Sequence, residues 1–138
     1  MTTAPARSPK DVAVIGAGSY GTCLAILAAS AGHRVDFWCR GAAAAAELQA
    51  TRENQLYLPG FRLPDGVTVT ADLETAVRGK QIVVGVTPSH AIRDVLGRAA
   101  AWLDPDVVVV NASKGLEDGT LQTIDRVYAD IFPARIAG

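Results

Sequence analysis

Three glycines near the N-terminus are spaced to bring a phosphorylated ligand close to the backbone. Gly16, Gly18 and Gly21 follow a short apolar run and precede an Ala- and Leu-rich segment, so they stand between an expected strand and an expected helix. The first glycine allows a tight turn, the second lets a pyrophosphate approach, and the third lets the helix pack on the sheet. Free N–H groups and the positive end of the helix dipole then face the phosphates. The spacing therefore predicts a dinucleotide-binding turn.

The second group of candidates lies at the end of the strand expected over residues 34–38. An acidic residue about twenty positions after the first glycine usually binds the adenosine ribose, and counting alone points at Asp36. Asp36 lies inside the strand, whereas the ribose sits beyond its end, so we expect its carboxylate to be paired in or beside the sheet. Cys39 and Arg40 stand at the strand end, where an arginine can bind a 2′-phosphate that no carboxylate repels. This pattern predicts NADP as the cofactor, with NAD as the alternative.

Alternating strand and helix patterns must position these residues. Apolar runs predict strands over residues 12–16, 34–38, 67–70, 81–86 and 107–110. Between and after them the pattern predicts helices over residues 19–30, 42–52, 72–77, 89–102 and 121–131. We expect the ends of these helices to be marked by Gly32, Asp72, Ser89 and Pro133. The alternation predicts an α/β fold of the Rossmann type, a doubly wound and mainly parallel sheet with helices on both faces.

Such a sheet places its ligand across the carboxyl ends of the strands, where the strand order reverses. Four loops should therefore share one crevice, those over residues 16–21, 39–40, 87–89 and 111–115. Lys114 belongs to the last of them and so should face the crevice. The segment over residues 53–64 has no helical period and is longer than most α/β connections, which is typical of loops with a function.

The bulk properties describe an ordinary globular domain. Of the 138 residues, 49% are hydrophobic and 20% charged, with a formal net charge of −1, which argues against nucleic acid as a partner. No apolar run approaches the roughly 18–20 residues of a membrane helix. Cys23 and Cys39 lack metal-ligand spacing and fit the reduced cysteines of a cytoplasmic protein. We expect residues 1–10 to be a disordered leader and residues 11–138 to form one dinucleotide-binding domain.

Five motifs, taken in order, resemble one family. They are Gly16-Ala-Gly-Ser-Tyr-Gly-Thr22, Trp38-Cys-Arg40, Asn54-Gln-Leu-Tyr-Leu-Pro59 with Leu63-Pro64, Pro88-Ser89 and Ser113-Lys-Gly-Leu-Glu117. The third and fifth are not general features of dinucleotide folds. From Val12 onward the chain resembles the N-terminal domain of the bacterial NAD(P)-dependent glycerol-3-phosphate dehydrogenases.

The resemblance implies that dihydroxyacetone phosphate is reduced to sn-glycerol 3-phosphate, a precursor for phospholipid biosynthesis. It implies that Ser19 and Tyr20 contact the pyrophosphate region of the cofactor and that Cys39 and Arg40 bind its adenosine end. Lys114 corresponds to a lysine that touches both the nicotinamide cofactor and the substrate. An ammonium there can stabilise the charge that develops on the carbonyl oxygen as hydride arrives.

The segment after the fourth strand holds three further candidates. Pro88 and Ser89 are expected to shape the nicotinamide side of the pocket, and Ser89 also suits a helix cap. A histidine can serve as a general acid, but the family does not use the position of His90 in this way, and we expect His90 to be an exposed residue of a first helical turn. We expect no functional role for His33.

The chain ends at Gly138, where the family continues into a helical substrate domain that carries the general acid/base lysine. We therefore expect no catalytic residue in this chain, weak cofactor binding and little or no turnover, and a homodimer only in the full-length form. A non-catalytic dinucleotide-sensing domain is one alternative, although it has no need of Lys114. A related NADP-dependent 2-hydroxyacid or ketopantoate-type reductase is another, although it should lack the motifs over residues 54–59 and 113–117.

Overall fold

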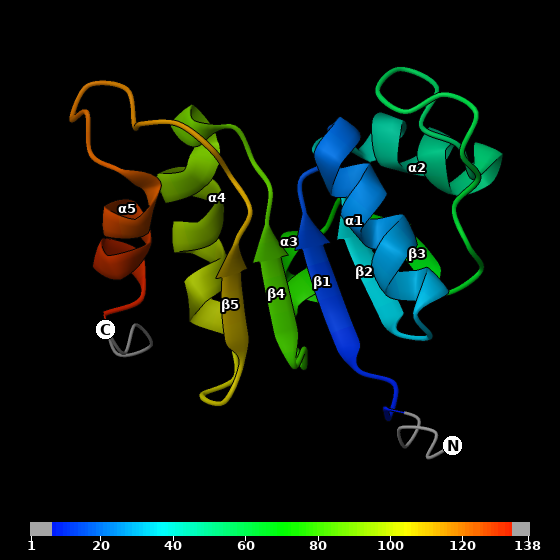
Figure 1. Cartoon of the computed structure of the whole chain (residues 1–138), viewed down its shortest axis with the longest axis horizontal. Helices are drawn as coiled ribbons and strands as arrows, with labels where there is room; N and C mark the ends of the chain where they lie inside the picture. The colour runs from blue at the N-terminus through cyan, green and yellow to red at the C-terminus, as the bar shows by residue number, and fades with distance from the viewer. Residues whose placement is uncertain (1–6, 134–138) are drawn as a thin grey trace, which may run out of the picture.

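A five-stranded parallel sheet forms the centre of the computed structural model, which describes residues 7–133 (Figure 1). Its strands are β1 (Asp11–Ile15), β2 (Arg34–Trp38), β3 (Val67–Thr70), β4 (Ile82–Gly85) and β5 (Val108–Asn111). Their order is β3-β2-β1-β4-β5, and every neighbouring pair is parallel. The order reverses between β1 and β4, which confirms the doubly wound Rossmann-type fold.

Helices cover both faces of the sheet. They are α1 (Ser19–Ser30), α2 (Ala42–Thr51), α3 (Leu73–Val77), α4 (Ile92–Ala99) and α5 (Ile124–Ile131). The side chains of β1 alternate between two apolar cores, as strand geometry requires. Val12 and Val14 pack in the core that contains residues of α1 and α2, whereas Ala13 and Ile15 pack in the core of α3, α4 and α5.

The structure corrects two of the expected helices. The helix expected over residues 89–102 is divided into η1 (Ser89–Ala91), α4 and η2 (Ala100–Trp102). Pro88 stands at the N-cap position of η1, so Ser89 is not the cap. The last helix begins at Ile124 rather than at residue 121, because Leu121 has a left-handed φ of 56° and the preceding residues form a β-bridge between Leu116 and Thr123.

The structure confirms the positions of two other expected helix ends. Gly32 follows α1 with a φ of 95°, a conformation that glycine adopts without strain, and its N–H donates to Ala29 O. Asp72 stands at the N-cap position of α3, where its carboxylate accepts a hydrogen bond from the Thr75 hydroxyl rather than from a backbone N–H.

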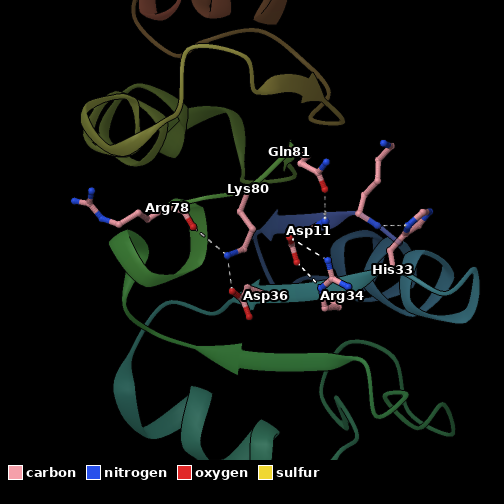
Figure 2. A network of polar contacts seen from close by, with 8 residues as sticks. Asp11, His33, Arg34, Asp36, Arg78, Lys80 and Gln81 are labelled. Atoms are coloured by element: carbon pink, nitrogen blue, oxygen red, sulfur yellow. Dashed lines mark hydrogen bonds and ion pairs between the residues drawn. The ribbon is translucent and has the colours of Figure 1, made fainter. Parts of the chain in front are cut away.

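Two ion pairs join residues of β1 and β2 and the residue Lys80 that precedes β4 (Figure 2). Asp36 lies 2.8 Å from Lys80 Nζ, which confirms that its carboxylate is paired beside the sheet. Asp11 pairs with Arg34 Nε at 2.6 Å, and the His33 Nδ1 atom accepts a hydrogen bond from the Lys10 N–H. The Arg34 N–H donates to Lys10 O at 3.0 Å, so Lys10 is bonded to β2, while residues 1–6 of the expected leader lie outside the described residues.

Candidate functional site

A cavity of about 970 Å³ lies at the carboxyl ends of β1, β2, β4 and β5. All four expected loops contribute to its wall. The structure places every predicted site residue there, namely Gly16, Gly18, Ser19, Tyr20, Gly21, Cys39, Arg40, Pro88 and Lys114. Ser89 is not among the lining residues. That these residues bind a cofactor stays a prediction.

A side chain would have a different effect at each of the three glycines. Gly16 has a φ of 127°, and a Cβ there would lie 2.6 Å from Val86 O. A Cβ on Gly21 would overlap the Gly16 carbonyl oxygen, so this position lets α1 meet the end of β1. A Cβ on Gly18 would meet no atom within 4 Å, because it would stand in open space. The fold thus requires Gly16 and Gly21, whereas Gly18 leaves free the volume that a ligand would use.

The N-terminus of α1 faces the cavity through Ser19 and Tyr20. Gly18 is its N-cap, no described side chain caps it, and its first turn contains no acidic residue. The first N–H groups of a helix lack intrahelical partners and carry a partial positive charge. This end of α1 is therefore suited to an anionic group.

The end of β2 supplies a cation, Arg40, for which no ion pair is found among residues 7–133. Arg40 is exposed, and its guanidinium carbon lies 5.8 Å from the centroid of the Trp38 ring. The Trp38 indole N–H donates to Ala71 O at 3.0 Å, which fixes the ring. Cys39 is buried in the core on the other face of the sheet from Trp38, and burial raises the pKa of its thiol. Asp36 lies in the middle of β2, two residues before the strand end, and is paired with Lys80.

Lys114 enters the cavity from the turn after β5. Its ammonium lies 5.9 Å from the centroid of the Tyr20 ring, so it reaches toward the N-terminus of α1. The Oγ–H of the preceding residue, Ser113, donates to Thr87 O at 2.7 Å, and this hydrogen bond connects the turn to the segment that follows β4. Thr87 also lines the cavity, and its buried hydroxyl has no hydrogen-bond partner among residues 7–133.

An ion-pair network fixes the other end of this turn. Arg93 on α4 places Nε 2.6 Å from Glu117 Oε2 and Nη2 3.0 Å from Asp130 Oδ2. The Thr120 hydroxyl donates to the other oxygen of Glu117 at 2.7 Å. Arg93 and Thr120 hold the pKa of Glu117 below its usual range, and the two carboxylates raise the pKa of Arg93. We call Arg93, Glu117, Thr120 and Asp130 the Arg93 network.

Several lining residues are absent from the set of predicted site residues. His90 and Asp94 both line the cavity, and their i, i+4 spacing would have placed Asp94 beside His90 on one helical face. His90 is exposed in η1, as expected for the first turn. Leu56 and Tyr57 bring the long loop over residues 53–64 to the cavity, whereas its length and its family motif indicated a function without placing these two side chains there.

Neither a metal site nor a membrane helix is found in the part of the chain that the structure describes. Residues 7–133 contain no group of three or more His, Cys, Asp or Glu side chains that could hold a metal ion. Within the same range, no helix is long and apolar enough to span a membrane.

Comparison with known proteins gives a consistent result. A family model described as "NAD-dependent glycerol-3-phosphate dehydrogenase N-terminus" matches residues 11–137. A relative from Geobacter metallireducens, named glycerol-3-phosphate dehydrogenase [NAD(P)+], is 46% identical over 129 residues, which are 94% of this chain and 38% of the relative. One of the same name from Geobacter sulfurreducens is 47% identical over 126 residues, 91% of this chain and 38% of the relative.

Solved structures agree with the sequence relatives. The crystal structure of glycerol-3-phosphate dehydrogenase from Coxiella burnetii superposes with a TM-score of 0.82 at 30% identity, over 88% of this chain and 37% of that one. A ketopantoate reductase from Ralstonia eutropha reaches 0.64 at 22% identity, over 80% of this chain and 36% of that one, and so shares the fold alone. The chain spans little more than a third of these proteins. Since the family model covers residues 11–137, the chain belongs to the family of NAD-dependent glycerol-3-phosphate dehydrogenase N-termini.

Proposed function

We propose that this chain binds the dinucleotide cofactor of a glycerol-3-phosphate dehydrogenase, with NADP(H) preferred to NAD(H). The reaction of the whole enzyme is then the reduction of dihydroxyacetone phosphate to sn-glycerol 3-phosphate in the cytoplasm. One observation carries the proposal: the glycine turn, Arg40 and Lys114 line one cavity although they come from distant parts of the sequence. The names of the relatives support the same activity.

The residues present fit a dinucleotide. Open space at Gly18 and the uncapped N-terminus of α1 suit a pyrophosphate, which needs N–H donors and close access to the backbone. The glycine turn with Ser19 and Tyr20 would hold the pyrophosphate, Cys39 and Arg40 the adenosine end, and Pro88 the nicotinamide side. When bound, the cofactor supplies the hydride.

Of the residues in this chain, Lys114 is the one that would act directly on the substrate. Dihydroxyacetone phosphate carries a phosphate dianion and a carbonyl whose oxygen gains charge during reduction. A lysine ammonium on the nicotinamide side binds either oxygen by a charge-assisted hydrogen bond. Its attraction grows as the oxygen becomes more negative, so it stabilises the transition state more than the ground state.

The preference for NADP(H) rests on Arg40, and cofactor titration of an Arg40→Ala variant tests it. A charge-assisted hydrogen bond contributes about 1.5–3 kcal/mol, so the affinity for NADPH should fall by about tenfold to a hundredfold. The affinity for NADH should change little, because NADH has no 2′-phosphate. Isothermal titration of the 138-residue chain with each cofactor measures both values.

An Arg62→Ala variant is the matched control, since Arg62 is exposed and does not line the cavity. Equal losses for NADPH and NADH in Arg40→Ala, or no loss of NADPH affinity, would remove the proposed preference. Failure of the unmodified chain to bind either cofactor would refute the wider proposal.

A further inference from the structure

Asn54 joins the long loop over residues 53–64 to the glycine turn. It is buried, with 8% of its surface exposed. Its amide nitrogen donates to Ala17 O at 3.0 Å and to Thr22 Oγ1 at 2.9 Å, while its amide oxygen accepts from the Tyr57 N–H at 3.2 Å. A buried amide with partners for both donors and for its oxygen is strongly fixed in orientation.

Thr22 extends this contact to the next peptide of the turn. It is fully buried in α1, and its hydroxyl donates to Gly18 O at 2.7 Å. The Thr22 N–H donates to the same oxygen at 3.0 Å. Because the hydroxyl accepts from Asn54 and has one hydrogen, its own bond is directed at Gly18 O. Asn54 and Thr22 thus hold two successive carbonyl groups, those of Ala17 and Gly18.

The held carbonyls determine the direction of two N–H groups. A trans peptide is planar, and its N–H points opposite to its C=O. The bond from Asn54 to Ala17 O therefore turns the Gly18 N–H to the other side of the chain. The bonds from Thr22 to Gly18 O do the same for the Ser19 N–H. Gly18 and Ser19 both line the cavity, on the stretch where the pyrophosphate is proposed to bind.

The loop that carries Asn54 is itself braced. Arg52, which ends α2 in a left-handed conformation, donates from Nη2 to Pro64 O at 2.6 Å and to Val67 O at 2.8 Å. Glu53 forms a β-bridge with Arg62 and accepts from the Gly60 N–H at 2.8 Å. These contacts close the loop on itself, so that Asn54 is presented to the glycine turn from a rigid support.

We infer that Asn54 is a positioning residue for the pyrophosphate site, acting on the Ala17 peptide directly and on the Gly18 peptide through Thr22. The inference rests on the proposed function, since it needs a pyrophosphate as the ligand. It assigns a role to the Asn-x-x-Tyr-Leu-Pro loop: the loop keeps two backbone donors aimed at the phosphates before the ligand arrives. Preorganised donors bind more tightly because binding then orders fewer groups.

The test compares ligands with and without a pyrophosphate. Thr22→Val removes the hydroxyl but keeps the volume and adds no charge, and Asn54→Leu removes the amide. We expect both variants to bind ADP and NADPH at least tenfold more weakly than the unmodified 138-residue chain. Adenosine 2′-monophosphate, which reaches Arg40 and has no pyrophosphate, should bind within twofold of its original affinity. Thr22→Ser should restore the affinity for ADP, because it restores the donor to Gly18 O.

Two further measurements separate positioning from a general loss of structure. Thermal melting identifies variants that fail to fold, and Thr22→Val is the milder change because its shape is kept. Amide chemical-shift changes of Gly18 and Ser19 on addition of ADP should be large in the unmodified chain and small in Thr22→Val. Folded variants that bind ADP as tightly as the original, or that lose both ligands equally, would overturn the inference. If the unmodified chain binds neither ADP nor NADPH, the proposed function and this inference fall together.

Discussion

The two sides of the cavity are built from different interactions. On the side of α1, the glycine turn is held by neutral groups: backbone contacts at Gly16 and Gly21 and buried hydrogen bonds from Asn54 and Thr22. On the side of β5, the Lys114 turn is held by the Arg93 network, whose arginine side chain is 40% exposed. Neutral buried contacts do not respond to pH or salt, whereas ion pairs respond to both. The α1 side should therefore be insensitive to pH and salt, whereas the Lys114 side should respond to both.

The largest expected effect comes from changing the packing of the glycine turn. Gly21→Ala places a methyl group on the Gly16 carbonyl, where backbone rather than a flexible side chain must move. The free energy of unfolding should fall by at least about 3 kcal/mol, the upper part of the range for overpacked sites. Urea denaturation of the 138-residue chain measures this change.

Gly18→Ala is the matched control, since its methyl group meets no atom within 4 Å. This variant should unfold within about 1 kcal/mol of the original, the usual size of a glycine-to-alanine change, yet lose most of its affinity for ADP. Equal destabilisation of the two variants would contradict the assignment of Gly21 to packing and of Gly18 to the ligand-facing surface.

A smaller effect is expected from the charged side. Arg93→Met leaves Glu117 buried without its main partner and frees one end of the Lys114 turn. The melting temperature should fall, but by less than in Gly21→Ala, and the amide signals of residues 113–117 should broaden. Arg98→Met is the control: its pair with Asp94 is exposed and 3.4 Å long, and such surface pairs contribute little. Equal shifts in the two variants would contradict a special role for the network.

The smallest expected effect is a pH dependence that only the charged side produces. Because the pKa of Glu117 is lowered in the folded chain, its contribution is complete above its unfolded pKa of about 4.3 and is lost as pH falls through the folded value. Melting temperatures of the original chain and Glu117→Gln should therefore converge between about pH 6 and pH 3. A constant difference over this range would show that Glu117 contributes nothing through its charge.

Local patterns in the sequence were sufficient to predict which residues form one part of the candidate site. The glycine turn, the end of β2 and the position of Lys114 follow from strand ends and residue types, because parallel strands bring their carboxyl ends to one edge. The contact from Asn54 to Ala17 joins residues 37 positions apart through one amide, and no periodic pattern encodes it. The late start of α5 has a similar cause, since the bridge between Leu116 and Thr123 replaces its first turn. Composition could not reveal that Tyr57 reaches the cavity.

Because the Trp38 indole is held in place on the cavity wall, its fluorescence can report whether the cavity is occupied. The chain has two tryptophans, of which Trp38 lines the cavity and Trp102 lies in η2, outside the lining residues. A ligand that occupies the cavity beside Arg40 would change the surroundings of Trp38 and leave Trp102 as an internal reference. A Trp102→Phe variant would isolate the responding emission, so occupancy could be followed without a label or a coupled reaction.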